Sequence, residues 1–398
     1  MRYDINRMRF GAFFAPFHSE KVNPTLAFER DFELIEWLDK LTYDEAWIGE
    51  HHSGAYECIA SPEVFIAAAA ARTKHIRLAT GVTSLSYHHP LILADRIAQL
   101  DHHLRGRLIF GVGPGQLVAD AHMMGVDPHS LRRRMDESLG VLVRLLNGET
   151  VTEKTDWFTL QEARCHILPY QSPTVEMAVA SAITPTGARA AGKYGLGMIS
   201  VAASSPQGFA ELANHWGICE AKAAEHGKSV DRANWRIVTP FHVAESREQA
   251  MEDLRFGLMD MMRYFRKFGG SAFPVANSFD EAMNIWTSGG LGAFGVGVIG
   301  TPDDLIAHIR KLQAQSGGFG AFLSLAHNAA DFTATKKSYE LFARHVMPEF
   351  QLANRNRGPS LEWAAANADR FMEHYVGGIQ AAIALHQNEQ DERAQKAR

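Results

Sequence analysis

Cysteine is scarce in this chain of 398 residues, and its three cysteines have neither a metal-site spacing nor the pattern of a disulfide framework. Cys58, Cys165 and Cys219 stand alone, which excludes zinc knuckles and disulfide-stapled secreted folds. Long hydrophobic runs are also missing: no segment approaches the ~20 apolar residues of a membrane span. The N-terminal MRYDINRMRFGAFF lacks a signal core of sufficient length, so we expect a cytoplasmic protein with free thiols.

An excess of positive charge is lacking too. The formal net charge is -5, and no cluster of Lys and Arg with interleaved aromatics could follow a phosphate backbone, so nucleic acid is not an expected partner. Apolar residues make up 46% of the chain and charged residues 21%, which is enough apolar material for one large domain or two ordinary ones. No internal repeat is evident, so solenoids and propellers are not expected.

The sequence does contain a repeated alternation of short β-branched or aromatic runs with longer segments of helical period. Eight strand-like runs occur, each followed by a helical segment: MRFGAFFAP, DEAWIGE, HIRLATGV, RLIFGVGPG, TVEMAVASA, LGMISVA, NWRIVTPFHVAES and GAFLSLA. Eight such units predict an α/β fold, a (β/α)8 TIM barrel with insertions and a C-terminal helical extension.

Two segments interrupt the alternation. Residues 149–172 have a polar–apolar period of two, which predicts a hairpin inserted into the barrel. Residues 268–300 are rich in Gly, Ser and aromatics and fit no single regular element, which predicts a long, lid-like loop over the sheet ends. We expect the barrel to occupy residues 1–350 and residues 351–398 to form a helical extension with a charged tail.

Polar side chains gather where the predicted strands end, which is the face that carries chemistry in such a barrel. The second strand delivers Glu50, His51 and His52; the other strands deliver Thr80, Gly81, Gly111 to Gly115, Ser181, Thr184, Ser200, His242, His327 and Asn328. Adjacent histidines on an extended chain point to opposite sides, so His51 and His52 are poorly placed to bind one metal together. This pattern favours a catalytic role over a metal site or a purely structural hydrogen-bonding role, both of which stay open.

Two further stretches suit a ligand. The glycines of GVGPG, residues 111–115, suit close approach to a flat ring or phosphate, or simply a tight turn; they do not match the nicotinamide fingerprint GxGxxG. In ASAITPTGARAAGKYG, Pro185 begins a helix whose free N–H groups suit a phosphate, while an ordinary cap by Thr184 is the competing interpretation. Arg132 is a candidate countercharge, although three neighbouring arginines also fit a solvated face.

The runs MRFGAFF, WIGEHHSGAY and LATGVTSLSYHHPLILADRIAQLDHHLRGRLIFGVGPG, with VASAITPTGARAAGKYG and a helix ending HVMPEF, resemble the bacterial luciferase-like flavin-dependent monooxygenases over about residues 8 to 350. The most specific motif is EHH combined with HP(x)nGRxxFGxGxG. The resemblance implies a (β/α)8 barrel that uses reduced FMN (FMNH2) from a separate flavin reductase. Dioxygen would then give a flavin C4a-hydroperoxide that oxygenates a small apolar molecule by hydroxylation or Baeyer–Villiger chemistry.

Carried over residue by residue, the resemblance implies a base or hydrogen-bond donor beside the flavin at His51, with His52 as its neighbour. It implies cofactor-binding positions at Thr80, Gly81, Val82, Arg132, Ser181, Ala182, Ile183 and Thr184. Of these, Gly81–Val82 matches a non-prolyl cis peptide bond under the isoalloxazine ring, Arg132 lies near the phosphate, and Ser181 to Thr184 form the phosphate loop. Gly113 stands where luciferases carry a reactive cysteine, so light emission is not expected.

Such chemistry requires a dry pocket. The aromatic residues of the 268–300 segment, Phe273, Phe279, Trp286 and Phe294, could cap that pocket or pack on the barrel. Two rival functions remain: a deazaflavin F420-dependent hydride-transfer oxidoreductase of the same superfamily, and a non-catalytic flavin-binding protein on the same barrel. A homodimer is expected from the resemblance.

Overall fold

The computed structural model describes residues 7–14 and 17–397 of the chain, and a closed barrel of parallel strands forms its centre. In spatial order the strands are β3 (Arg77–Thr80), β2 (Glu45–Ile48), β1 (Arg9–Phe14), β13 (Ala321–Ala326), β10 (Trp235–Thr239), β9 (Gly197–Ser200), β8 (Glu176–Ser181) and β5 (Leu108–Gly113). The barrel closes because β5 pairs with β3, and the short β4 (Thr83–Ser84) also lies along β5. The predicted (β/α)8 architecture is confirmed.

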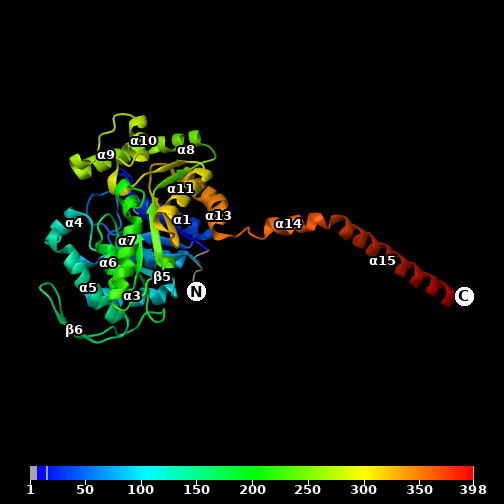
Figure 1. The fold of residues 1–398 in the computed structure, drawn as a ribbon, viewed down its shortest axis with the longest axis horizontal. Coiled ribbons are helices and arrows are strands. Elements are labelled where there is room, and N and C mark those ends of the chain that lie inside the picture. The colour runs from blue at the N-terminus through cyan, green and yellow to red at the C-terminus, as the bar shows by residue number, and fades with distance from the viewer. Residues whose placement is uncertain (1–6, 15–16, 398) are drawn as a thin grey trace. The chain divides into compact units, whose positions relative to one another are not determined.

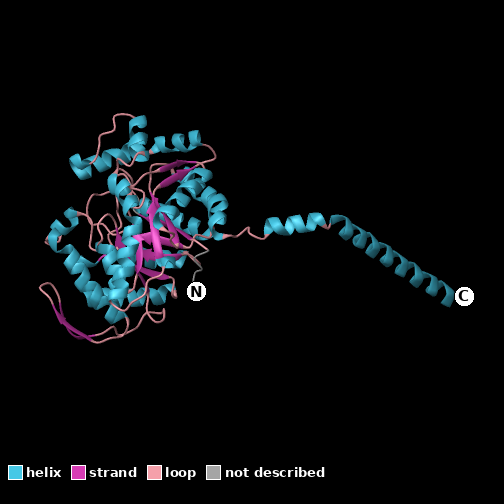
Figure 2. Cartoon of the chain, viewed as in Figure 1, coloured by secondary structure: helices cyan, strands magenta, loops and turns pink. Residues whose placement is uncertain are grey.

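Helices enclose the strands, as Figure 2 shows. The outer helices are α1 (Pro24–Lys40), α2 (Pro62–Arg72), α3 (Pro90–Leu104), α5 (Leu131–Leu146), α6 (Thr186–Tyr194), α7 (Pro206–Glu225), α11 (Pro302–Ser316) and α12 (Phe332–Leu341), with α13 (Met347–Gln351) after α12. Five of them have proline in the first turn, where the missing N–H has no intrahelical acceptor to lose. The N-terminus of α11 is closed by a capping box between Thr301 and Asp304.

Alternate residues of each strand face the helices and the barrel interior. Phe10 and Phe14 of β1 pack in one buried cluster with residues of the outer helices. Trp47 of β2 and Leu323 of β13 belong to a second cluster, which fills the interior. Period-two alternation on β1 therefore separates an outer core from an inner one.

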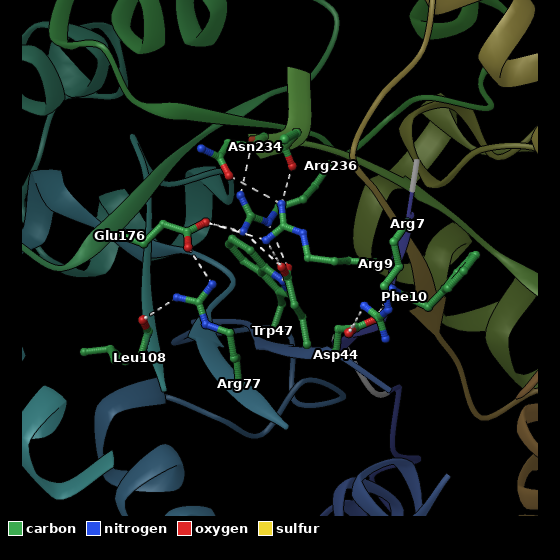
Figure 3. A network of polar contacts seen from close by, with 12 residues as sticks. Arg7, Arg9, Phe10, Asp44, Trp47, Arg77, Leu108, Glu176, Asn234 and Arg236 are labelled. Atoms are coloured by element: carbon green, nitrogen blue, oxygen red, sulfur yellow. Dashed lines mark hydrogen bonds and ion pairs between the residues drawn. The ribbon is translucent and has the colours of Figure 1, made fainter. Parts of the chain in front are cut away.

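The floor of the barrel is an ion-pair network at the amino ends of the strands (Figure 3). Arg236 contacts Glu45 at 2.8 Å and Glu176 at 2.5 Å, while Arg9 contacts Glu45 at 2.6 Å and Arg77 contacts Glu176 at 2.5 Å. Burial by itself raises the pKa of Glu45, but Arg236 and Arg9 outweigh it and lower that pKa to about 2. The network closes this end, so a ligand reaches the interior from the carboxyl ends of the strands.

The two predicted insertions have different outcomes. Residues 149–172 contain the antiparallel pair β6 (Val151–Lys154) and β7 (Thr159–Ala163), which confirms the hairpin. The loop prediction for 268–300 is wrong: this segment contains α10 (Phe279–Thr287) and β12 (Val298–Gly300). The N-cap of α10 explains the helix, because Ser278 accepts a hydrogen bond from the N–H of Glu281, a signal masked by the surrounding glycines.

The predicted seventh strand is divided in the structure. Pro240 separates β10 from β11 (Phe241–Val243), and β11 leaves the barrel to pair with β12 in a small parallel sheet. His242 therefore lies on this small sheet and does not end a barrel strand. Helices α8 (Arg247–Asp253) and α9 (Leu258–Gly269) follow, and Figure 1 shows α8, α9 and α10 grouped together on the side away from the hairpin.

Residues 352–398 form a separate unit, which matches the predicted helical extension. Its helices are α14 (Arg357–Ala366) and α15 (Ala368–Lys396), and neither has a buried residue. In the part of the chain that the structure describes, no helix combines the length and apolarity needed to cross a membrane.

Candidate functional site

Glu50 is the centre of a buried hydrogen-bond cluster just beyond the end of β2. Its Oε1 lies 2.9 Å from Nε2 of His52 and 3.0 Å from Nε2 of His88, and its Oε2 accepts the backbone N–H of Ser84 at 2.9 Å. Burial raises the pKa of Glu50, but the hydrogen bonds from His52, His88 and Ser84 outweigh it and lower that pKa to about 2. Glu50 is therefore an ionised anchor that ties the β2 exit to the loop after β3.

His51 points to a different pair of acids. Its Nε2 lies 3.1 Å from Oε2 of Glu57, and its Nδ1 lies 3.7 Å from Oδ2 of Asp120, on the short helix α4 (Val118–Met123). Burial lowers the pKa of His51, yet Glu57 and Asp120 outweigh it and raise that pKa to about 10. The imidazole is thus a cation at neutral pH and a hydrogen-bond donor, which is the opposite of a free base.

The two histidines have separate partners, as their alternation along an extended chain predicts. In the described ranges 7–14 and 17–397, no group of three or more His, Cys, Asp or Glu residues is arranged to hold a metal ion. The side chains of His51 and His52 thus bind different acids, while Asp120 also accepts a hydrogen bond from the backbone of His52 and so connects the two acid–histidine assemblies.

Sequence reasoning missed three members of these assemblies: Glu57, His88 and Asp120. Glu57 lies only six positions after His51, and His88 belongs to the quoted HHP run that follows the third strand, so both residues could have been found from the sequence. Asp120 follows the exit of β5 and could be found only from the closure of the barrel. Nearby, the hydroxyl of Tyr87 is buried with no hydrogen-bond partner in the described part of the chain, and burial raises its pKa to about 12.

Small residues surround the mouth of the barrel beside these histidines. A Cβ on Gly81 would come within 2.9 Å of the Cβ of Trp47, and one on Gly113 within 2.6 Å of Cγ2 of Val82. The Gly81–Val82 peptide bond is cis, as the resemblance implies. Trp47 and Val82 occupy the space that a side chain at Gly81 or Gly113 would need, so only glycine fits at these two positions.

Thr80, predicted as a cofactor-binding residue, turns its side chain to the neighbouring strand. Its Oγ1 donates a hydrogen bond of 2.6 Å to the carbonyl oxygen of Gly111, and the residue is fully buried. A side-chain contribution of Thr80 to ligand binding would require that hydrogen bond to break.

The segment after β8 has the features of an anion site. The hydroxyl of Ser181 is buried without a partner among the described residues, while Ala182, Ile183 and Thr184 are exposed. The competing interpretation of an ordinary cap by Thr184 is wrong, because α6 begins at Thr186 and no side chain caps it. Its first N–H groups therefore remain available to an anion.

A glycine allows α6 to begin so close to the strand. A Cβ on Gly187 would lie 2.1 Å from the carbonyl oxygen of Ala180 and 2.7 Å from Cα of Ser181. Any larger residue would push the helix terminus away from the end of β8. The orphaned Ser181 hydroxyl, the uncapped helix and the small-residue mouth fit a cofactor with a phosphate and a planar ring.

Arg132 lies at the start of α5 and is exposed, with no ion-pair partner in the described part of the chain. The adjacent Arg133 is bound instead to Glu137 and Asp156, each at 2.8 Å. Arg134 has no ion-pair partner among the described residues either, and its guanidinium lies 5.1 Å from the centroid of the Trp157 ring. The exposed guanidinium of Arg132 therefore stays a proposed countercharge for a phosphate.

A cover of aromatic and methionine side chains continues the inner cluster above the mouth. Residues Met261, Met262, Tyr264 and Phe265 of α9, with Met283 and Trp286 of α10 and Phe294, are buried in the same cluster as Trp47 and Leu323 of the barrel. Of the predicted lid aromatics, Trp286 and Phe294 are buried members, and Phe273 and Phe279 pack against the cluster. The segment predicted to be a lid therefore contributes buried helical side chains to the inner cluster.

Three other polar residues that the sequence placed at strand ends are engaged in structural contacts. His242 binds Asp253 at 2.9 Å, and Nε2 of His327 donates to the carbonyl oxygen of Phe241 at 3.0 Å. Asn328 bonds Nδ1 of His18 at 3.0 Å. These groups hold the small sheet and the β13 exit in place and leave the EHH assemblies as the candidate site.

Comparison with known proteins agrees with this geometry. Residues 8–319 match the family model described as luciferase-like monooxygenase. Limonene 1,2-monooxygenase of Rhodococcus erythropolis is 49% identical over 363 residues, which cover 91% of this chain and 90% of that protein. The 4-hydroxyprotoasukamycin monooxygenase of Streptomyces nodosus subsp. asukaensis is 43% identical over 367 residues, covering 92% and 98% respectively.

A solved structure shares the fold. It is the oxygenating constituent of 3,6-diketocamphane monooxygenase from Pseudomonas putida, a type II Baeyer–Villiger monooxygenase in complex with FMN. It has a TM-score of 0.71 and 23% sequence identity, and the match covers 86% of this chain and 98% of that one.

Proposed function

Because the chain belongs to the family of luciferase-like monooxygenases, we propose that it catalyses the flavin-dependent oxygenation of a small apolar molecule with dioxygen. The observation that carries this proposal is the cationic His51, held by Glu57 and Asp120 beside the small-residue mouth. A cationic hydrogen-bond donor near a mouth covered by apolar side chains suits oxygen transfer in a dry pocket.

We propose reduced FMN as the cofactor. The hydroxyl of Ser181, the backbone of Ala182, Ile183 and Thr184 and the first N–H groups of α6 would hold the phosphate, with Arg132 as a countercharge. The isoalloxazine ring would lie against Gly81–Val82 and Gly113. When bound, the reduced flavin supplies the two electrons that activate dioxygen.

His51 acts in this scheme as a hydrogen-bond donor. Its pKa, raised to about 10 by Glu57 and Asp120 against the opposing effect of burial, leaves no proton acceptor on the ring at neutral pH. The base role that the resemblance also allowed is therefore disfavoured. His52 is fixed by Glu50 and presents its ring to Tyr87, with centroids 6.2 Å apart, so it would shape the pocket wall.

The cover suggests the substrate class. The aromatic and methionine side chains of α9 and α10 offer dispersion contacts and few hydrogen bonds, which suits an apolar terpenoid or ketone. The name of the Rhodococcus relative supports a monoterpene as the first compound to test. Product analysis decides between hydroxylation and Baeyer–Villiger insertion.

A separate flavin reductase is the proposed source of reduced FMN. The Pseudomonas neighbour is described as an oxygenating constituent, which supports a two-component system. A homodimer is the proposed assembly.

The test is a single-turnover reaction. The full-length chain is mixed anaerobically with photoreduced FMN, exposed to air in the presence of limonene or a bicyclic ketone, and the extract is analysed by mass spectrometry with ¹⁸O₂. Incorporation of one labelled oxygen in the wild type, and its loss in His51→Ala, are expected. No labelled product from any apolar compound, together with hydride transfer from reduced F420, would favour the deazaflavin rival. Flavin binding with no turnover of reduced FMN or reduced F420 would favour the rival function of a non-catalytic flavin-binding protein.

A further inference from the structure

The loop between β2 and α2 connects the acid partner of His51 to the cover over the barrel. Residues 53–58 of this loop carry Glu57, whose carboxylate lies 3.1 Å from Nε2 of His51. The neighbouring residue, Tyr56, is buried and points to α9. One short segment thus contacts both the reacting side of the site and its lid.

The contact with α9 is an aromatic stack. The rings of Tyr56 and Tyr264 lie 4.2 Å apart at an interplanar angle of 20°, and Tyr264 stacks in turn on Phe268 at 5.6 Å. The hydroxyl of Tyr56 donates a hydrogen bond of 3.2 Å to Oδ2 of Asp260, also on α9. This contact fixes the loop from one side.

A glycine permits that close approach. A Cβ on Gly54 would lie 3.0 Å from the ring of Phe268 and 3.1 Å from the hydroxyl of Tyr264. Gly54 also has φ of +83°, a conformation that side-chain-bearing residues rarely adopt. The loop is therefore shaped to fit under α9.

On the other side, the same loop reaches α4. The hydroxyl of Ser53 donates to Oδ1 of Asp120, the second acid beside His51. The charged groups that face the imidazole are Glu57 from the loop and Asp120 from α4. From α9, the hydroxyl of Tyr264 faces the same two acids: burial first, and then Glu57 and Asp120, raise its pKa.

We propose that the Tyr56–Tyr264 stack positions Glu57 against His51, so that closure of α9 over the barrel assembles the ion pair and its opening releases it. Tyr264 is then a positioning residue: it forms no ion pair with Glu57, Asp120 or His51 and acts through Tyr56. The role of α9 as a moving lid rests on the proposed function.

As a consequence, the His51 ring keeps its second proton while the cover is closed. With Glu57 in contact, the His51 ring is held in its cationic, donating form. When α9 lifts, Tyr56 follows it and Glu57 moves away from His51. The imidazolium can then transfer its proton to water, and no other bond is made or broken. Lid position and protonation of the donor would be coupled in this way.

The test measures the His51 ring directly, without flavin. The full-length chain is labelled with ¹³C-histidine, the Cε1–Hε1 resonance is assigned with His51→Gln, and its shift is followed from pH 5 to about 10.5 by NMR. Tyr264→Leu removes the stack, Tyr264→Phe keeps it, and Phe273→Leu is the matched control, since Phe273 stacks on Phe265 elsewhere in the lid at 5.3 Å.

The expected result is a midpoint lowered by about one pH unit or more in Tyr264→Leu, and an unchanged midpoint in Tyr264→Phe and Phe273→Leu. Tyr56→Leu removes the same stack from the side of the loop and should lower the midpoint of the His51 titration equally. This variant replaces Tyr264→Leu if the latter does not fold. The proposal would be overturned if Glu57→Gln lowers the midpoint of the His51 titration while the folded Tyr264→Leu and Tyr56→Leu variants leave it unchanged. Because no turnover is measured, this outcome is independent of whether the chain oxygenates any substrate.

Discussion

The Nε2 atom of His51 lies 3.1 Å from a carboxylate oxygen of Glu57, in a pocket where both side chains are largely shielded from water. The first consequence is a pH dependence of stability. The pKa of His51 is raised above its ordinary value to about 10, so the stabilisation that its ion pair provides is fully present below about pH 6.5 and is lost as the pH rises from there through 10.

The free energy of unfolding of the wild type should therefore fall relative to His51→Gln between about pH 6.5 and 10. The slope of that difference is at most about 1.4 kcal/mol per pH unit. Urea denaturation at several pH values measures it, and Glu57→Gln should flatten the same difference. A difference that stays constant from pH 6.5 to 10 would mean that the ring is not held as a cation.

Replacing Glu50 by Gln should destabilise the fold by about 3 kcal/mol at pH 7, because His52, His88 and the N–H of Ser84 lose an anionic acceptor. The pKa of Glu50 is lowered to about 2, so its contribution is present above about pH 4.5 and fades as the pH falls through 2. The gap between wild type and variant should shrink over that range. Glu149→Gln, which removes an exposed partner of Arg144, should cost less than about 1 kcal/mol.

Ser181→Ala separates binding from stability. The hydroxyl has no partner in the described part of the chain, so its removal should leave the unfolding midpoint unchanged or slightly raised. If the hydroxyl binds the phosphate of FMN, affinity should fall about 10-fold or more, since hydrogen bonds to charged groups contribute about 1.5 to 3 kcal/mol. Flavin fluorescence titration provides the affinity. Unaltered affinity would remove Ser181 from the phosphate site.

The floor of the barrel is expected to tolerate little change. Glu45→Gln leaves Arg236 and Arg9 short of a buried countercharge and should destabilise the protein by about 3 to 5 kcal/mol. Glu340→Gln, which removes the exposed pair with Arg344, is the control and should cost about 0.5 kcal/mol. Guanidinium denaturation compares the two; similar small losses in both would show that the floor network is dispensable.

The sequence predicted the barrel because its evidence is local. The strand-like run that forms β1, the segment of helical period that forms α1 and the EHH run after β2 are each readable within one segment. The hairpin of residues 149–172 was found for the same reason. Where local signals conflicted, prediction failed: glycines on both sides hid α10, and Pro240 split a run that resembles one strand.

The chain by itself determined which residues stand at strand ends, because strand and helix periods are properties of neighbouring residues. Only tertiary structure decided their partners. Asp120 reaches His51 from 69 positions away, counted from 51 to 120, and Tyr264 reaches Tyr56 across most of the barrel sequence. These contacts exist because closing the sheet brings the ends of distant strands to one rim, and with them the charges that make His51 a cation.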